Sequence, residues 1–99
     1  MAKLILRQEA IDDLTNIWKY TVQNWSKNQA DKYFGKIKSA CIDIFESAVI
    51  GKKYDKIEIN LLGHKVEKHI IFYRTISESE IEVIRILHER MDLKNKLRD

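Results

Sequence analysis

The chain has 99 residues, a mass of 11.8 kDa, 44% hydrophobic residues, 33% charged residues and no proline. This length fits one domain over residues 1–99, and two Trp, four Tyr and three Phe in so short a chain exclude intrinsic disorder. A net charge of +3, from 18 basic and 15 acidic residues, is too small to indicate direct nucleic-acid binding.

The cellular compartment follows from the cysteine count and from the apolar runs. The single cysteine, Cys41, excludes an intramolecular disulfide and is typical of a reducing compartment. The apolar run at residues 4–6 is too short for a signal-peptide core, and no run approaches the roughly 20 residues of a membrane helix. We expect a cytoplasmic protein that does not bind membranes.

The first half of the chain predicts a strand and a helical hairpin. Residues 3–6 predict a short strand, and from Gln8 the hydrophobic side chains recur with the helical period to about Asn24. Ser26 followed by Gln29 is a capping box, so a second helix is expected from Lys27 to about Val49. The apolar stripe of this helix comprises Ala30, Tyr33, Phe34, Ile37, Cys41, Ile44 and Ala48.

Glycines and acidic residues refine this picture. We interpret Gly35 as a point of close packing against the first helix, and Gly51 as a left-handed C-terminal cap. The acidic residues Glu9, Asp12 and Asp13 fall in the first turns of the first helix, where the helix dipole favours negative charge.

The second half alternates with a period of two. Residues 57–66, 69–76 and 81–87 predict a three-stranded antiparallel meander, and residues 88–99 predict a frayed helical turn. The fold class is therefore α+β. The strand at 69–76 is apolar on both faces, so both faces need cover. The helical hairpin covers one face, and either the C-terminal tail or another molecule covers the other.

Metal and nucleotide chemistry find little support. The histidines at 64, 69 and 88 lack the local spacing of a zinc site, and three glycines form no phosphate-binding loop. Cys41 fits a small buried hydrophobe. We expect neither a metal nor a cofactor.

Polar residues on the strands are compatible with several roles. Arg74 and Arg85 interrupt apolar strands, and His88 closes the last one, near Tyr73. The arginines could pair with a glutamate such as Glu82. With the histidine and the tyrosine they could hold a phosphate and move a proton, as RNA cleavage requires. They could equally dock an acidic partner.

The hairpin is rich in aromatic residues. Trp18, Trp25, Tyr33 and Phe34 fall on the apolar stripes and are expected in the core. Tyr20 and Phe45 lie off the stripes and are candidates for a partner surface, because aromatic anchors dominate interface energetics.

The order of elements and several segments resemble the ParE branch of the RelE/ParE toxin superfamily. The resemblance covers nearly the whole chain. Ala10, Asp13-Leu14, Ile17-Trp18 and Tyr20 resemble the first helix of that family, and Trp25, Gln29-Ala30 and Tyr33 resemble its inter-helix turn and second helix. His69–Arg74 resembles its third strand, and Ile84–Asp92, which includes Met91, resembles its closing strand and tail.

The resemblance implies a toxin of a type II toxin–antitoxin pair, of the kind linked to plasmid stabilisation. It implies a ParD-like antitoxin with a ribbon-helix-helix DNA-binding half and a C-terminal segment that wraps the toxin. The ParE branch is associated with poisoning DNA gyrase, and the RelE branch with ribosome-dependent mRNA cleavage. Leu62 stands where ParE-like chains often carry arginine. The sheet therefore has one cation fewer, which weakens the hypothesis of a nuclease.

The leading hypothesis is a binding toxin without catalytic residues, which acts on gyrase. Its candidate target- or antitoxin-binding residues are Tyr20, Phe45, Tyr73, Arg74, Arg85, His88 and Met91. One alternative is an endoribonuclease that uses Arg74, Arg85 and His88. Another is a non-toxic relative that binds an antitoxin and regulates transcription with it. We also expect an apolar groove between the hairpin and the sheet that receives the antitoxin segment.

Overall fold

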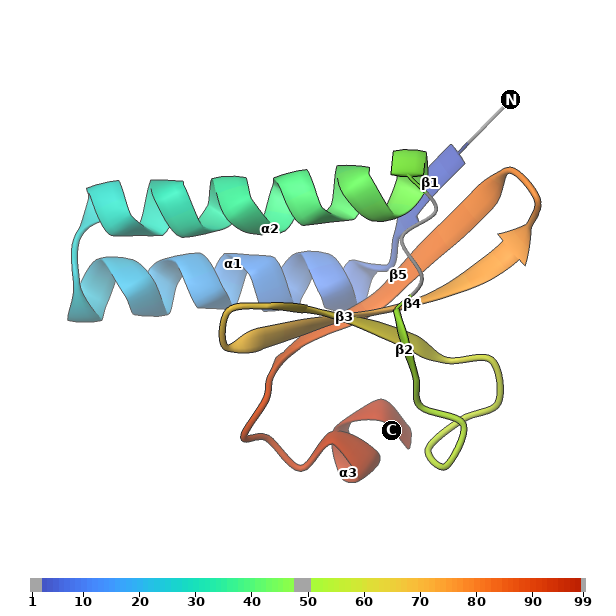
Figure 1. Cartoon of the computed structure of the whole chain (residues 1–99). Coiled ribbons are helices and arrows are strands. Elements are labelled where there is room, and N and C mark those ends of the chain that lie inside the picture. Colours follow the sequence, from blue (N-terminus) through green and yellow to red (C-terminus); the bar gives the residue numbers. More distant parts are fainter. Residues whose placement is uncertain (1–2, 48–50, 99) are drawn as a thin grey trace.

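A computed structural model describes residues 3–47 and 51–98. Its elements are β1 (Lys3–Leu6), α1 (Gln8–Asn24), α2 (Lys27–Ser47), β2 (Lys52–Lys53), β3 (Leu62–Val66), β4 (His69–Ser77), β5 (Glu80–His88) and α3 (Leu93–Arg98). Helices α1 and α2 run antiparallel along one face of the sheet, and α3 lies on the other side (Figure 1). The predicted α+β class, the N-terminal strand and the helical hairpin are confirmed.

The sheet has five strands in the order β1-β5-β4-β3-β2. Strand β1 pairs with β5 in parallel, whereas the other three pairs are antiparallel. The predicted meander is β3-β4-β5, and β2 was not predicted. The first predicted strand, at 57–66, is shorter than expected, because its first residues belong to a loop in which Asn60 adopts a left-handed φ of 67°.

The hairpin turn forms as the capping box predicts. The backbone N–H of Gln29 donates to the Ser26 hydroxyl oxygen at 3.1 Å, which satisfies one of the free donors at the start of α2. Helix α2 ends at Ser47 in the described residues. The predicted end near Val49 and the stripe residue Ala48 lie outside them.

Both glycine interpretations are wrong. A Cβ added to Gly35 would meet no atom within 4 Å, because this residue lies on the exposed side of α2 rather than against α1. Gly51 does not adopt a positive φ. Its role is close approach, since a Cβ there would lie 2.6 Å from the Gly63 carbonyl oxygen and 2.8 Å from the Tyr73 hydroxyl oxygen.

The larger core lies between the hairpin and the sheet. Its buried residues come from both helices and from the two central strands: Ala10, Ile37, Ala40, Cys41, Ile44, Ile71, Tyr73, Val83 and Ile86. Partly buried Leu14 and Ile17 of α1 pack against them. These side chains fill the space where we expected an apolar groove between hairpin and sheet, so that expectation is wrong.

A second core covers the opposite face of the sheet. Its buried members are Leu61, Ile70, Phe72, Ile84 and Leu87, and its partly buried members are Tyr54, Ile57, Leu93 and Leu97. The loop after β2 and helix α3 therefore cover the face that the sequence left open between tail and partner. A register shift opposite Phe72 and Tyr73 places Ile84 on this face and Val83 on the hairpin face.

In the part of the chain that the structure describes, no helix has both the length and the apolar character of a membrane span.

Candidate partner-binding surface

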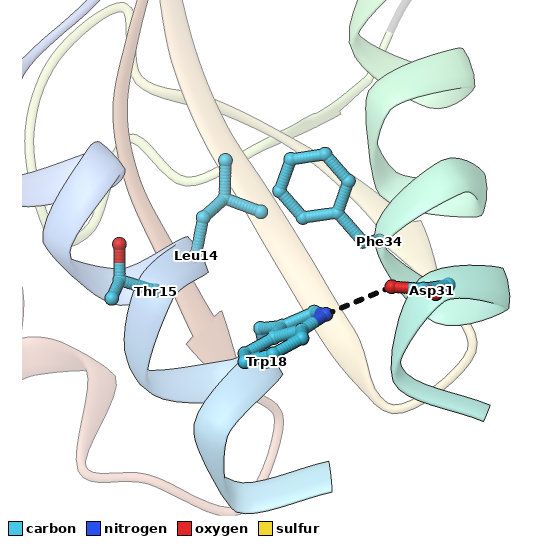
Figure 2. Close-up of a pocket in the computed structure, with 5 residues that line it drawn as sticks. All are labelled: Leu14, Thr15, Trp18, Asp31 and Phe34. Carbon is cyan, nitrogen blue, oxygen red and sulfur yellow. Dashed lines mark hydrogen bonds between the residues drawn. The ribbon is translucent and has the colours of Figure 1, made fainter. Parts of the chain in front are cut away.

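The helical hairpin carries an open hollow between its two helices. Leu14, Thr15 and Trp18 of α1 and Asp31 and Phe34 of α2 line it, and its volume is about 510 Å³. Figure 2 shows Leu14 and Phe34 pointing toward one another across the gap between the helices. The Trp18 indole N–H donates to the Asp31 carboxylate at 3.1 Å and closes one end. The hollow is thus mostly apolar, with one polar bridge that links the helices.

Two aromatic residues of the hairpin are more exposed than the sequence predicted. Phe34 is 41% exposed and Trp25 is 75% exposed, although both were expected in the core. Phe34 lines the hollow between the helices, and Trp25 is the C-cap residue of α1, beyond its last helical turn. The expected core residues Trp18 and Tyr33 are partly buried.

Of the partner-surface candidates that lie outside the central strands, two are exposed. Tyr20 of α1 is 64% exposed and Met91, which follows β5, is 44% exposed. Phe45 near the end of α2 is half-buried. None of the three lines the hollow between the helices.

Arg85 connects three elements. Its guanidinium donates to the Asp13 carboxylate through Nε at 2.8 Å and Nη2 at 3.0 Å, and through Nη1 to the Lys96 carbonyl oxygen at 3.2 Å. The same carboxylate accepts the Ile86 backbone N–H at 3.0 Å. Strand β1 pairs only with residues 80–83, so Asp13 satisfies the edge of β5 just beyond the end of β1.

Asp13 is therefore a residue that sequence reasoning missed. We attributed its charge to the helix dipole, and helix α1 does place it near the start. The available signal was its spacing, since Asp13 follows the buried Ala10 by three residues and so faces the sheet.

Arg74 has a different environment. It donates through Nη2 to Glu58 Oε1 at 2.6 Å, in the loop before β3. Glu82, which lies opposite Arg74 in the sheet, pairs instead with Arg7 at 3.2 Å. Both arginines pair with acidic residues, which is one of the alternatives that the sequence left open, but the suggested partner Glu82 is wrong.

Tyr73 is not a surface residue. It is 2% exposed in the larger core, and its hydroxyl oxygen accepts the Gly51 backbone N–H at 2.9 Å. Its function is to hold the segment after α2 against the sheet, so its candidacy as a binding residue is wrong.

His88 belongs to a cluster that the sequence did not predict. It lies opposite His69 on β4, with ring centroids 5.2 Å apart, and its Nδ1 accepts the Arg90 backbone N–H at 3.1 Å. The Tyr33 hydroxyl is hydrogen-bonded to His69 Nδ1 and donates to the Val66 carbonyl oxygen at 3.2 Å. The cluster fastens α2 to the end of the sheet.

Burial and the neighbouring histidine shift the pKa values of groups in this cluster. Burial, assisted by His88, lowers the pKa of His69 from 6.5 to about 4, so its ring is neutral at physiological pH. Burial also raises the pKa of the Tyr33 hydroxyl above its usual value of 10.0. A neutral histidine and a protonated tyrosine suit a structural hydrogen bond.

The described residues offer no group of three or more His, Cys, Asp and Glu side chains that could hold a metal ion. Cys41 is buried in the larger core, as expected, and burial raises its pKa to about 11, which makes the thiol unreactive at neutral pH.

Comparison with known proteins assigns the chain to a family. A family model described as the ParE toxin of the type II toxin–antitoxin system parDE matches residues 4–93. The chain belongs to the ParE toxin family. It is a toxin of a type II toxin–antitoxin system, with a cognate antitoxin as its partner.

Individual relatives agree with this assignment. Toxin ParE1 of Mycobacterium tuberculosis is 30% identical over 96 residues, which cover 97% of this chain and 98% of the relative. Toxin ParE of Escherichia coli is 30% identical over 99 residues, covering 100% and 96% of the two chains. A chain from the chromosomal ParDE system of P. aeruginosa shares the fold, with a TM-score of 0.77, 18% identity and coverage of 89% and 96%.

Proposed function

We propose that this ParE-family toxin inhibits growth by binding DNA gyrase, that it has no catalytic site of its own, and that an antitoxin segment neutralises it by binding the hairpin. Gyrase as the target is supported by membership of the ParE family, and the observation that supports the second statement is the dispersal of the groups that a nuclease would use. Arg74 pairs with Glu58 and Arg85 with Asp13, on different elements.

The strand register quantifies this dispersal. His88 lies opposite His69, and Arg74 follows His69 by five residues on the same strand. Five residues of a strand span about 16 Å. The two residues are also an odd number of positions apart, so their side chains lie on opposite faces of the strand: His69 bonds Tyr33 of α2, and Arg74 bonds Glu58 of the loop on the other face. A single phosphodiester group would have to contact both faces at once, whereas a protein partner can contact each of them separately.

The hollow between α1 and α2 suits the antitoxin segment. Its apolar lining of Leu14, Trp18 and Phe34 matches the apolar face of an amphipathic helix. Lys27, Lys32 and Lys38 are exposed on α2, so an acidic face on the incoming helix would be complementary. An antitoxin tail that is disordered when free and folds on binding meets these requirements.

The antitoxin proposal is tested by two matched substitutions. Phe34 lines the hollow and Ile42 does not, yet the two are exposed to 41% and 39% on the same helix. Phe34→Ser is expected to weaken the antitoxin complex by about tenfold or more, and Ile42→Ser by less than about threefold. Titration of purified toxin with the antitoxin segment measures both. Equal effects of the two substitutions would contradict the assignment of the hollow.

The target is tested with purified gyrase and, in parallel, with ribosomes translating a defined mRNA. We expect the wild-type toxin to inhibit DNA supercoiling and to leave the mRNA intact. His88→Ala is expected to change toxicity by less than about tenfold, because the toxin acts by binding. A nuclease that used His88 as general acid or base would instead lose about 10²–10⁴-fold in activity. Cleavage of mRNA by the wild type that disappears in His88→Ala would overturn the proposal, and absence of any growth defect would favour a non-toxic antitoxin-binding protein.

A further inference from the structure

The loop between β2 and β3, residues 54–61, has a fixed shape. Its ends are joined by the Tyr54 backbone N–H, which donates to the Leu61 carbonyl oxygen at 2.8 Å. Two turns follow inside it, closed by Ile57 N–H to Tyr54 O at 2.9 Å and Leu61 N–H to Glu58 O at 3.2 Å. The Asp55 carboxylate accepts the Asn60 backbone N–H at 3.2 Å. These hydrogen bonds close the loop on itself.

Side chains fasten this loop to the face of the sheet that the hairpin does not cover. The Tyr54 ring meets Phe72 edge-on with centroids 5.1 Å apart, and it lies against Gly63, where a Cβ would come within 2.5 Å of the ring. Leu61 is 0% exposed. Outside the apolar contacts, Glu58 accepts the 2.6 Å hydrogen bond from Arg74.

Ile59 stands out at the tip of this fixed loop. It occupies the second position of the turn from Glu58 to Leu61, and Asn60 takes the third position with φ 67°, as a type II turn requires. Ile59 is 75% exposed, although both Ile57 and Leu61 pack inward. A preorganised apolar side chain of this kind binds with little ordering cost.

The surroundings of Ile59 are basic. Lys52, Lys53 and Lys56 are exposed in and beside the loop and outnumber its two carboxylates, of which Glu58 is paired with Arg74 and Asp55 accepts the Asn60 N–H. A hollow of about 320 Å³ adjoins the loop, lined by Lys53, Asp55, Asn60, Leu62 and Thr75. An apolar knob with a basic rim is complementary to an apolar recess rimmed by carboxylates.

We propose that the toxin binds its target protein through the 54–61 loop. Ile59 would enter an apolar recess of the target that is rimmed by carboxylates. This inference rests on the proposed function, because it presumes a protein target. The sheet separates this loop from the helical hairpin (Figure 1), so target and antitoxin contact different parts of the toxin.

The test compares Ile59→Asp with Ile76→Asp, since Ile76 is an isoleucine of β4, 51% exposed and outside the loop. Growth inhibition, inhibition of purified gyrase and affinity for the antitoxin segment are measured for each. Ile59→Asp is expected to reduce growth and gyrase inhibition by about tenfold or more, and Ile76→Asp by less than about threefold. Both variants are expected to retain the antitoxin affinity and the unfolding midpoint of the wild type.

Full growth inhibition by Ile59→Asp would overturn the inference, as would a loss of antitoxin affinity that equals the loss of toxicity. A wild-type toxin that stops growth without inhibiting gyrase would refute the proposed target alone, because the growth assay still reports on the loop. Lys56→Glu provides a second variant with an unchanged core. We expect it to slow association with gyrase and to weaken the salt dependence of binding.

Discussion

The two faces of the sheet are covered by very different structures. On one face, two helices of 17 and 21 residues supply a continuous core and meet the sheet through the Tyr33–His69 and Asp13–Arg85 contacts. On the other face, the 54–61 loop contributes one fully buried residue, Leu61, and the rest of the cover from this loop and the six-residue helix α3 is only partly buried. Helices as short as α3 are marginal in isolation, so this cover depends on the sheet beneath it.

This difference suggests a division of roles. The hairpin forms the body of the fold and presents a hollow, whereas the opposite face uses short segments to fix one loop in place. Arg85 lies where the two meet, since it contacts Asp13 on the hairpin and Lys96 on α3. The following substitutions test this comparison.

The largest effect is expected from Phe72→Ala, which removes the central side chain of the second core. Phe72 is 0% exposed and supports the Tyr54 ring, so we expect a loss of about 3–5 kcal/mol in the free energy of unfolding. Urea denaturation of the purified toxin measures it. The 54–61 loop should also lose hydrogen-exchange protection while α1 and α2 retain theirs. An equal loss of hydrogen-exchange protection in the hairpin and in the loop would contradict the division of roles between the two faces.

The next effect separates two ion pairs. Asp13 and Arg85 side chains are 13% and 22% exposed, whereas Arg74 and Glu58 are 30% and 44% exposed. Asp13→Ala removes the carboxylate that accepts two hydrogen bonds from Arg85 and one from the Ile86 N–H, so we expect a loss of about 2–3 kcal/mol. Glu58→Ala should cost less than about 1 kcal/mol. Similar losses in chemical denaturation would contradict the structural role of Asp13.

The pH dependence of stability reports on the hairpin face. Because the pKa of His69 is lowered to about 4, the unfolded chain binds more protons than the folded chain between pH 6.5 and 4. Stability is therefore fully present above pH 6.5 and falls as the pH drops toward 4. We expect protonation of His69 to account for about 1–2 kcal/mol of the loss in the free energy of unfolding over this pH range, after allowance for its partial solvent exposure.

Tyr33 and His88 contact the His69 ring, and the negative charges of Asp13 and Glu89 act on its pKa in the opposite direction to burial. Urea denaturation at several pH values should show a flatter profile for His69→Gln than for the wild type. His64→Gln on β3 serves as the control and should keep the wild-type slope. An unchanged slope in His69→Gln would show that the Tyr33–His69 contact does not set the pH response.

The smallest effect is a gain. Gly35 lies in the interior of α2, on its exposed side, with no atom within 4 Å of an added Cβ. Gly35→Ala is expected to raise the free energy of unfolding by about 1 kcal/mol, because alanine has the higher helix propensity. Thermal unfolding measures this gain. A loss of stability would indicate that the surface around this glycine is needed for packing after all.

The sequence predicted the elements whose pattern is local. The period of the apolar residues placed α1, β4 and β5, and the Ser26 capping box placed the start of α2. Strand β2 escaped prediction because two lysines carry no periodic signal, and the register shift near Ile84 depends on pairing between distant residues.

The candidate site was harder to predict for the same reason. Tyr20 and Met91 are exposed as expected, but Tyr73 is buried in the larger core under the hairpin and bonds Gly51, 22 residues away. The partners of Arg74 and Arg85 lie 16 and 72 residues away, so strand spacing could not identify them. Leu14 and Phe34 form a hollow only because the two helices pack side by side.

The central claim is that antitoxin and target use different faces of the toxin, and hydrogen exchange of the toxin with and without its antitoxin segment tests it most directly. We predict slower exchange in α1 around Leu14 and Trp18 and in α2 around Asp31 and Phe34, with no change at residues 54–61. Protection of the 54–61 loop by the antitoxin, with the hairpin unchanged, would contradict the claim.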